Sequence, residues 1–242
     1  MSTTALITRA TSGIGRAVAN KLAQLGVHVL VVGRNVDRGK KTIAEIRSAG
    51  GQADFISSDL RDASSAREVA RRATELGNGH VDILINNAGI YPFGRTHETS
   101  EELFDKVYSL NVKVPYFLVA ELAPLMATRG KGAIVNLSTM VADYGASGTS
   151  LYGSSKAAIN LLTKSWTAEY GASGVRVNAV SPGPTRTEGT DAMGEGVDRL
   201  AAPAGRPATA DAIAETVVFL ATDRSSFVQG AKLAVDGGRT AI

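Results

Sequence analysis

The sequence predicts an α/β fold in which helices cover both faces of one doubly wound parallel sheet of about seven strands. Three observations support this prediction. Short apolar runs alternate with longer amphipathic segments, a glycine-rich turn follows the first run, and the later runs are continuous in Val, Ile, Leu and Ala. Such continuous runs are typical of parallel strands buried on both faces. The 242 residues contain no linker or repeat, so we expect a single domain, 1–242.

Composition argues against several classes of protein. No run approaches the roughly 20 consecutive apolar residues that span a membrane, and no secretory leader is recognisable. The 26 basic and 23 acidic residues are interspersed, which does not indicate a nucleic-acid surface despite the net charge of +3. The chain has no cysteine, and its three histidines lack metal-ligand spacing. We therefore expect a cytoplasmic protein without a bound metal and without nucleic-acid or membrane partners.

The first strand, Thr4–Thr8, ends in a glycine-rich turn that opens a helix over Arg16–Leu25. Glycines let the backbone approach a pyrophosphate, and the helix N-terminus supplies unpaired N–H donors and a positive dipole end. A Gly-x-Gly motif alone is a weak indication, but a Rossmann-type, dinucleotide-binding fold requires it at this first strand-to-helix junction. The candidate cofactor contacts in the turn are Arg9, Thr11, Ser12, Gly13, Ile14 and Gly15.

The second strand, Val27–Val32, ends where such folds commonly distinguish NAD from NADP. An acidic residue about 20 residues after the glycines binds the adenosine ribose of NAD, whereas a cation accommodates the 2′-phosphate of NADP. This chain has Arg34 and Asn35 there, with Arg38 one turn further on. Asp37 falls in the first turn of the next helix, where it complements the helix dipole. We therefore predict NADP(H), with NAD(H) as the less favoured cofactor.

Two further strand ends carry candidate cofactor contacts. Helices and strands alternate here over Asn35–Ala49, Ala53–Ile56, Asp62–Leu76 and Asp82–Ile85. Asp59 and Leu60 could bracket an adenine ring, although Asp59 could equally cap a helix. The turn after the next strand contributes Asn87, Ala88 and Gly89, a small and polar set that suits either a cofactor contact or a plain turn.

The strongest indication of chemistry lies between a buried strand and a helix that begins near Ser150. Tyr152 and Lys156 share one face of that helix. A fixed cation lowers the pKa of a nearby phenol, which suits the phenol to exchange a proton with a carbonyl or an alcohol. Ser138 and Thr139 end the preceding strand, where a hydroxyl could hold the same substrate oxygen.

A long helix over Ser100–Ala127 precedes that strand, with Ser100 as its N-cap. Asn111 lies within it, and since Asn is a poor helix former we expect either a plain structural role or a specific hydrogen bond at a local bulge. The remaining elements are strands at Ala133–Leu137, Val175–Val180 and Lys232–Val235 and a helix at Ala210–Ala221. Residues 186–207 lack strand periodicity and could form a mobile lid.

Right-handed crossovers place the carboxyl ends of all the strands along one edge of the sheet, where ligands bind. The residues expected at this edge are Gly13, Arg34, Asp59, Asn87, Thr139 and Pro182. The turn after Val180 adds the cofactor contacts Pro182, Gly183, Thr185 and Thr187. The candidate walls of a substrate pocket are Tyr91, Phe93, Met140, Tyr144 and the segment Glu188–Leu200, each of which could also be plain core or surface.

Over its whole length the chain resembles the classical short-chain dehydrogenases/reductases, and above all the bacterial 3-oxoacyl carrier-protein reductases and related carbonyl reductases. The motifs that carry this resemblance are the glycine turn, Asn86-Asn87-Ala88-Gly89, Asn111, the hydroxyl pair, Tyr152-x-x-x-Lys156 and Pro182-Gly183. The resemblance implies that Tyr152 is the general acid in ketone reduction and that Lys156 lowers its pKa and binds the nicotinamide ribose. It also implies that Asn111 holds a water in a proton relay.

Further implications of the resemblance concern the cofactor and the assembly. The backbone at 87–89 would contact the adenosine side of the cofactor, and residues 182–187 would contact its nicotinamide end. Family members commonly pair through their long helices, so we expect a dimer or tetramer that uses the helices holding Asn111 and Lys156. Periodicity alone cannot distinguish such a face from a core face.

Two positions depart from the family's pattern. The glycine turn usually begins Thr-Gly, whereas this chain has Thr8 followed by Arg9. Arg9 could weaken cofactor binding, or its side chain could swing outward and clamp the 2′-phosphate; we favour the clamp. The catalytic hydroxyl is usually a serine 13 residues before the tyrosine, a position held here by Thr139. Adjacent residues at a strand end point to opposite faces, so we choose Thr139 over Ser138.

The leading hypothesis is therefore an NADP(H)-dependent oxidoreductase that interconverts a small ketone and a secondary alcohol. The alternative is a sensor or scaffold protein that binds a dinucleotide with little or no turnover, which Arg9 and Thr139 would favour. The presence of Tyr152, Lys156 and Asn111 together argues for the enzyme, because a binding module needs no such set.

Overall fold

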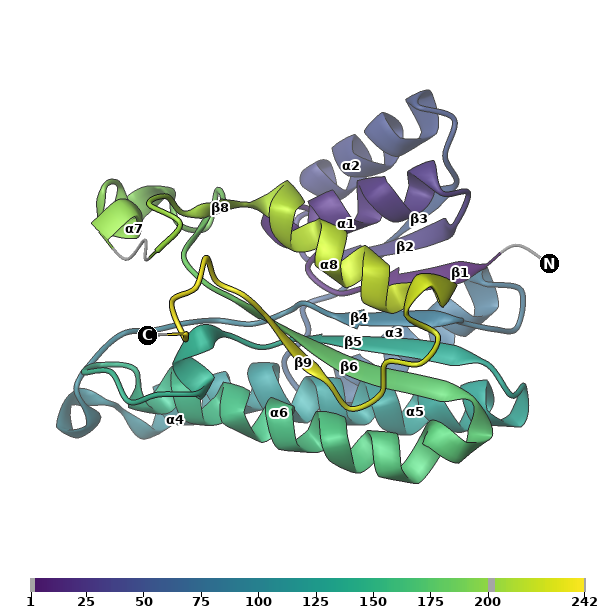
Figure 1. Ribbon diagram of the computed structural model, residues 1–242. Helices are drawn as coiled ribbons and strands as arrows, with labels where there is room; N and C mark the ends of the chain where they lie inside the picture. Colours follow the sequence, from purple (N-terminus) through teal and green to yellow (C-terminus); the bar gives the residue numbers. More distant parts are fainter. Residues whose placement is uncertain (1–2, 200–202, 242) are drawn as a thin grey trace.

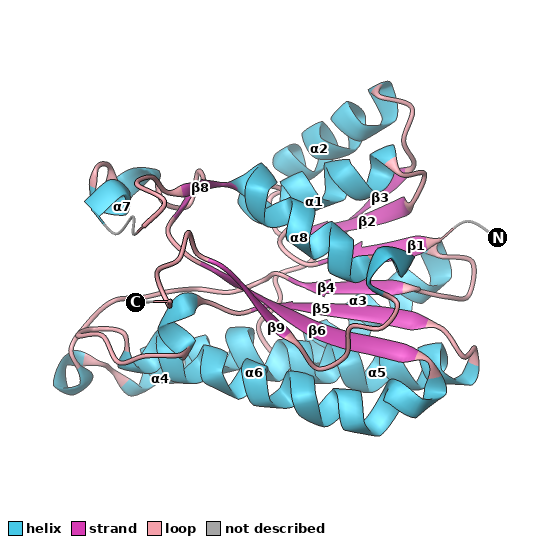
Figure 2. Ribbon diagram, viewed as in Figure 1, coloured by secondary structure: helices cyan, strands magenta, loops and turns pink. Residues whose placement is uncertain are grey.

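The computed structural model describes residues 3–199 and 203–241. Its centre is a seven-stranded sheet in the order β3-β2-β1-β4-β5-β6-β9, and every pair of neighbouring strands is parallel. Helices lie above and below this sheet (Figures 1 and 2). The predicted fold class, a doubly wound parallel sheet of about seven strands, is confirmed.

The bounds of the elements follow the sequence-based prediction closely. The strands of the sheet are β1 (Thr4–Ile7), β2 (His28–Gly33), β3 (Ala53–Ser57), β4 (Ile83–Asn86), β5 (Gly132–Leu137), β6 (Val175–Pro182) and β9 (Lys232–Val235). The helices are α1 (Gly13–Gln24), α2 (Val36–Ser48), α3 (Ala63–Leu76), α4 (Glu101–Tyr108), α5 (Val114–Thr128), α6 (Ser150–Tyr170), α7 (Gly196–Arg199) and α8 (Ala210–Ala221). The first helix begins three residues earlier than predicted, because Gly13 in the glycine turn is already its first residue.

Two apolar layers hold the sheet between its helices. Successive residues of a strand point to opposite faces, so Ala5 and Ile7 pack toward α1, α2 and α8, whereas Leu6 packs toward α3, α5 and α6. The same alternation runs along the central strands. Their side chains are buried on both faces, which explains why the strands appear in the sequence as continuous apolar runs.

Local capping fixes where several helices begin. Asn35 accepts a hydrogen bond from Arg38 N at the start of α2, and Ser100 accepts one from Leu103 N at the start of α4. Asp62 forms a capping box with Ser65 at the start of α3. The prediction left open whether Asp59 is a helix cap, and the cap of α3 is Asp62 instead.

The long helix predicted over Ser100–Ala127 is interrupted. A π-helical turn, Ser109–Lys113, separates α4 from α5, and Asn111 lies at its centre. Of the two roles left open for Asn111, the structure therefore shows the specific hydrogen bonding at a local bulge. By length and composition the combined helix, Glu101–Thr128, could cross a membrane, but 44% of the tested window is buried inside the fold. Its apolar residues pack against the sheet together with α3 and α6, so we interpret it as a core helix.

Of the segment predicted as a lid, residues 186–199 and 203–207 stand apart from the main sheet beside the carboxyl ends of the strands (Figure 1). It contains a 3-10 turn at Asp191–Met193 and the short helix α7. A parallel pair of two-residue strands, β7 (Thr185–Arg186) and β8 (Ala208–Thr209), closes its base. Leu200, which ends the predicted pocket wall, lies outside the described residues.

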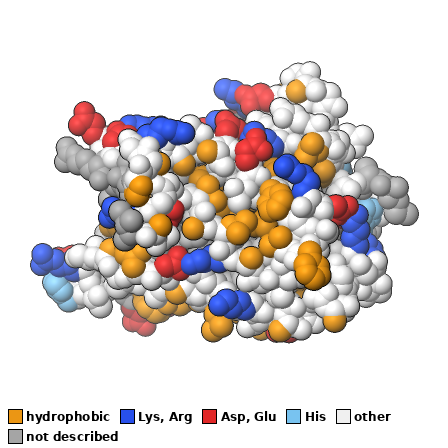
Figure 3. Space-filling view, viewed as in Figure 1, with side chains coloured by type: hydrophobic (Ala, Val, Ile, Leu, Met, Phe, Trp, Pro, Cys, Tyr) orange, Lys and Arg blue, Asp and Glu red, His pale blue; other side chains and the backbone are white. Residues whose placement is uncertain are grey.

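The surface has apolar areas on more than one side. Figure 3 shows hydrophobic side chains gathered over the middle of the face that carries β9 and α8, with charged side chains more dispersed around them. Phe227, in the loop before β9, is fully exposed. On the helices that carry the sequence motifs, Phe104, Tyr116 and Leu161 are also exposed.

Candidate active site

The carboxyl ends of the strands surround a cavity of about 610 Å³. Most of the predicted site residues line it, namely Arg9, Ser12, Gly13, Ile14, Asn87, Gly89, Thr139, Tyr152, Lys156, Pro182, Gly183, Thr185 and Thr187. The predicted pocket walls Tyr91, Phe93, Met140 and Tyr144 line it as well, together with lid residues such as Met193 and Val197. The predicted residues that do not line it are Thr11, Gly15, Arg34, Asn35, Asp59, Leu60, Ala88 and Asn111.

Tyr152 lies in the first turn of α6, with its phenol buried in the cavity wall. Burial raises the pKa of the phenol to about 12, the Thr139 hydroxyl interacts with it and opposes this effect, and Tyr91 adds to the rise. The ring of Tyr91 meets that of Tyr152 edge to face, with 6.1 Å between centroids. Thr139 is thus the hydroxyl that reaches the phenol. Ser138 Oγ is buried without a hydrogen-bond partner among the described residues.

Lys156 is buried one turn further along α6, and its Nζ donates a hydrogen bond of 2.7 Å to the carbonyl oxygen of Leu137. Burial, together with the nearby Arg9 guanidinium, lowers the pKa of Lys156 to about 8. We expected Lys156 to lower the pKa of Tyr152, but in the free protein the phenol's pKa is raised, not lowered. The physical reason is that desolvation of the buried phenol outweighs any influence of the neighbouring cation.

Asn111 braces the wall behind these residues instead of facing the cavity. Its Oδ1 accepts from Ile90 N at 2.9 Å, and its Nδ2 donates to Ile90 O at 2.9 Å and to Ser155 Oγ at 3.0 Å. Because of the π turn, this amide reaches both the loop after β4 and helix α6. The water-holding role implied by the family resemblance remains a prediction.

The glycine turn is held against the end of β4 by hydrogen bonds. Asn87 Nδ2 donates to the carbonyl oxygens of Thr8 and Arg9, and Thr8 Oγ1 accepts from the backbone N–H groups of Asn87 and Ala88. A Cβ on Gly15 would lie 2.5 Å from Arg9 O and 2.5 Å from Asn87 Nδ2. Close packing of the turn therefore requires glycine at this position.

Arg9 occupies a position where the backbone favours glycine. Its φ angle is +50°, in the left-handed region that L-residues seldom adopt. Its guanidinium donates a hydrogen bond to the carbonyl oxygen of Gly89 and lies close enough to Lys156 to affect that residue's pKa. In the free protein Arg9 therefore reaches across the cavity, and not outward to Arg34 as the predicted phosphate clamp requires.

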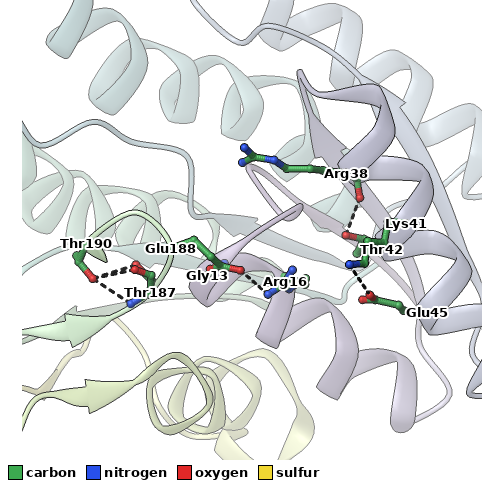
Figure 4. A network of polar contacts seen from close by, with 9 residues as sticks. All are labelled: Gly13, Arg16, Arg38, Lys41, Thr42, Glu45, Thr187, Glu188 and Thr190. Carbon is green, nitrogen blue, oxygen red and sulfur yellow. Dashed lines mark hydrogen bonds and ion pairs between the residues drawn. The ribbon is translucent and has the colours of Figure 1, made fainter. Parts of the chain in front are cut away.

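The adenosine end of the predicted cofactor site is open. Arg34 is exposed, and neither its guanidinium nor that of Arg38 has a hydrogen bond or ion pair within residues 3–199 and 203–241. Figure 4 shows the Arg38 side chain extending from α2 without a partner among the residues drawn. Asn35 is used as the N-cap of α2, and Asp59 is exposed. Two cations without a partner at the end of β2 suit a phosphate group.

Sequence reasoning missed Thr8 and Arg239 at this site, and it placed Glu188 only in a candidate pocket wall, without its contact to the glycine turn. Thr8 organises the turn through its buried hydroxyl. Glu188 reaches Gly13 and Arg16, and Arg239 lines the cavity from beyond the end of β9. A threonine directly before the glycine turn could have indicated the first. No local pattern could have indicated the contact of Glu188 with Gly13 or the position of Arg239, because their neighbours in space are distant in sequence.

In the described part of the chain, the charged side chains that line the cavity are the cations Arg9, Lys156 and Arg239, and no carboxylate lines it. A carboxylate oxygen of Glu188 accepts a hydrogen bond from the backbone N–H of Gly13 at the N-terminus of α1, and so occupies the place where a bound phosphate is expected. The residues present therefore fit a dinucleotide whose phosphates lie at that helix end. No group of three or more His, Asp or Glu side chains that could hold a metal is found among the residues described.

The fold and the site together define a dinucleotide-dependent oxidoreductase of the doubly wound class. A family model described as Enoyl-(Acyl carrier protein) reductase matches residues 9–240. The chain belongs to the short-chain dehydrogenase/reductase family.

Three known proteins illustrate the similarity. The 3-oxoacyl-[acyl-carrier-protein] reductase FabG of Thermotoga maritima is 33% identical, over 96% of both chains. The cis-4-hydroxycyclohexanecarboxylate dehydrogenase of Sinomonas cyclohexanicum is 37% identical, over 98% of this chain and 96% of the other. A solved structure from Beutenbergia cavernae, assigned provisionally as an NAD(P)-dependent gluconate 5-dehydrogenase and holding NADP at low occupancy, has a TM-score of 0.91 with 37% identity. That alignment covers 99% of this chain and 97% of the other.

Proposed function

We propose that this protein is an NADP(H)-dependent oxidoreductase that interconverts a ketone and a secondary alcohol, with Tyr152 as general acid and base. The single observation that carries the proposal is the buried phenol of Tyr152, which meets the Thr139 hydroxyl in the wall of a cation-lined cavity. With a pKa of about 12, the phenol is protonated at neutral pH. It is then in the form that can donate a proton to a ketone oxygen.

The residues around Tyr152 have separate tasks in this mechanism. Thr139 donates a hydrogen bond to the substrate oxygen and so aligns it with the phenol. Lys156 places a positive charge beside the cofactor site, where it would hold the ribose and favour the anionic cofactor, while Asn111 would hold the relay water implied by the family resemblance. When bound, the reduced nicotinamide supplies the hydride. In the reverse direction Tyr152 accepts the alcohol proton, which requires the phenolate.

Preference for NADP(H) over NAD(H) is supported by the charges at the end of β2. Arg34 and Arg38 are exposed, and in the described chain their guanidinium groups have no partner. The nearest acid, Asp37, lies in the first turn of α2, where it complements the helix dipole. An Arg pair without a carboxylate partner suits the additional 2′-phosphate. The NADP found in the similar structure from Beutenbergia cavernae is consistent with this preference.

We further propose that the substrate carries a carboxylate or a comparable anionic group beside an apolar body. Arg239 lines the cavity on the lid side, and its guanidinium has no hydrogen bond or ion pair in the part of the chain described. Arg9 and Lys156 lie on the cofactor side, so Arg239 is the cation left to bind a substrate anion. Tyr91, Met140 and Val197 supply apolar wall. The hydroxycyclohexanecarboxylate relative acts on an acid of this kind.

The proposed assembly is a dimer or tetramer in the cytoplasm. Phe104, Tyr116 and Leu161 are exposed on α4, α5 and α6, the helices that family members use for pairing. Exposed aromatic and aliphatic side chains on these helices favour burial against a second copy. Analytical ultracentrifugation is expected to show a dimer or tetramer, and a stable monomer at micromolar concentration would contradict this part of the proposal.

Fluorescence titration with NADPH and with NADH, followed by a panel of keto acids and matched neutral ketones, tests the function. We expect NADPH to bind more tightly than NADH, and at least one keto acid to be reduced. Binding without turnover on any ketone would favour the alternative sensor or scaffold protein. Preference for NADH would contradict the assignment of Arg34 and Arg38 to the 2′-phosphate.

A further inference from the structure

Glu188, in the lid, lies at the place where the cofactor's phosphates are expected. Its Oε2 accepts a hydrogen bond of 2.9 Å from Gly13 N, and its other carboxylate oxygen pairs with the guanidinium of Arg16 (Figure 4). Gly13 and Arg16 both belong to the first turn of α1. The carboxylate therefore connects the lid to the glycine turn across 175 residues of sequence.

Among the described residues, no acidic side chain other than Glu188 bonds to the N-terminus of α1. Ser12 is the N-cap residue but makes no side-chain cap hydrogen bond, and the first turn contains no acidic residue. Unpaired N–H groups and the positive dipole end make this helix terminus attractive to an anion. Glu188 supplies that anion from the lid. Burial acts to raise the pKa of Glu188, but hydrogen bonds that include Gly13 N, together with Arg16, lower it on balance, so the group is ionised at neutral pH.

The lid backbone is also close to the turn. A Cβ on Gly13 would lie 3.3 Å from Thr187 Cβ, so the lid segment lies closely against the glycine turn. Thr187 is fixed in turn by Thr190, whose Oγ1 accepts from Thr187 N at 2.9 Å. A second attachment joins Tyr91 Oη to the carbonyl oxygen of Gly189 at 2.6 Å. Contacts therefore hold the lid on both sides of Glu188, at Thr187 and at Gly189.

We propose that Glu188 is an intramolecular competitor of the cofactor, which latches the lid onto the phosphate-binding end of α1 until a dinucleotide displaces it. This proposal rests on the dinucleotide binding of the family and extends it to regulation of the same site. Two anions cannot share one helix N-terminus without strong repulsion. Binding of the dinucleotide therefore expels the carboxylate, releases Arg16 to pair with a phosphate, and frees the segment that carries Thr187.

The latch lowers the apparent affinity for the cofactor, because only the fraction of molecules with Glu188 displaced can bind it. Glu188→Gln removes the charge and nearly preserves the shape, so it is expected to bind NADPH and NADH each at least about three-fold more tightly than the parent. Glu188→Asp keeps the charge but shortens the reach, and it is expected to behave like Glu188→Gln. Glu215→Gln is the matched control, because Glu215, on α8, pairs with Lys21 of α1 and does not line the cavity.

A second readout needs no cofactor. Trypsin can cut the lid after Arg186, which is exposed and followed by Thr187. Without the latch this bond is expected to be cut faster in Glu188→Gln than in the parent and in Glu215→Gln, with the rest of the chain cut at the same rate. Unchanged cofactor affinity together with unchanged lid cleavage would overturn the proposal, and so would weaker cofactor binding by Glu188→Gln. Neither readout depends on turnover, so an inactive protein could still show the latch, and failure of the proposed function would be recognised separately.

Discussion

The ammonium of Lys156 donates a hydrogen bond of 2.7 Å to the carbonyl oxygen of Leu137, at the end of the strand that precedes the active-site helix. This bond fixes the cation behind Tyr152 before any cofactor binds. The same burial that fixes Lys156 lowers its pKa to about 8 and raises that of Tyr152 to about 12. In the free protein at neutral pH the two groups are therefore in the protonation states that ketone reduction requires, a cationic lysine and a neutral, protonated phenol.

The pKa of Lys156 predicts a pH dependence for cofactor binding. Because a lysine is charged below its pKa, its attraction for the dinucleotide is present at pH 7 and is lost as the pH rises through about 8. Affinity for NADPH is therefore expected to fall between pH 7 and 9, where the cofactor's phosphates remain ionised. Replacing Arg9 by Gly removes a neighbouring cation, so the pKa of Lys156 should rise and the fall in affinity should move to higher pH. Identical pH profiles for the parent and Arg9→Gly would contradict this prediction.

The cations at the end of β2 predict the cofactor preference. Removing Arg34 by substitution to Ala is expected to weaken NADPH binding by roughly 10-fold or more, since a hydrogen bond to a charged group contributes about 1.5–3 kcal/mol. NADH, which lacks the 2′-phosphate, should bind to Arg34→Ala as it does to the parent. Lys40→Ala, an exposed cation further along α2, is the control. Equal losses for NADPH and NADH would show that Arg34 does not contact the additional phosphate.

The close packing around Gly15 predicts that the turn requires glycine at this position. A methyl group at Gly15 would lie 2.5 Å from Arg9 O, a contact that the backbone can relieve only by moving. Gly15→Ala is therefore expected to destabilise the fold by about 1–3 kcal/mol, which for a chain of this size lowers Tm by roughly 2–4 °C per kcal/mol. Gly94→Ala is the control, because nothing lies within 4 Å of a Cβ there. Differential scanning calorimetry compares the two, and equal Tm values would refute close packing at Gly15.

The position of Arg239 in the cavity wall predicts a preference for anionic over neutral ketones. Arg239→Met is expected to lower kcat/KM for a keto acid by about 10-fold or more, because a charge-assisted hydrogen bond is lost. The matched neutral ketone should be reduced as before, and Arg239→Lys should recover part of the activity on the acid. A loss of the same size on the neutral ketone would assign Arg239 to packing and would remove the support for an anionic substrate.

Features of the fold and of the site that depend on neighbouring residues in the chain could be predicted from the sequence. Continuous apolar runs predict strands that the structure buries on both faces. The misfit of Asn111 within a helix indicated a local bulge as one of two possibilities, and a π turn is found there. The pleat of one strand, together with the family's spacing of 13 residues before the tyrosine that the resemblance implies, predicts that Thr139 and not Ser138 meets the phenol. Each of these depends on neighbours close in the chain or on the pleat of one strand.

Features that depend on burial and on distant neighbours could not be predicted in this way. The sequence suggested a lowered phenol pKa from the nearness of Lys156, but the degree of burial that reverses it is a property of the folded chain. The side chain of Arg9 reaches Gly89, 80 residues away, and Glu188 reaches Gly13, 175 residues away. No periodicity encodes such contacts. They arise only when the sheet brings its strand ends together.

The most direct test of the central claim compares Tyr152→Phe with the parent in two measurements on the same samples, NADPH affinity by fluorescence titration and turnover on the best ketone of the panel. Tyr144→Phe is the control, since Tyr144 also lines the cavity but its hydroxyl has no hydrogen-bond partner among the described residues. We expect Tyr152→Phe to keep its affinity for NADPH and to lose turnover by about 10²- to 10⁴-fold, the contribution typical of a positioned general acid. Turnover within a few-fold of the parent would contradict the assignment of Tyr152 as the proton donor.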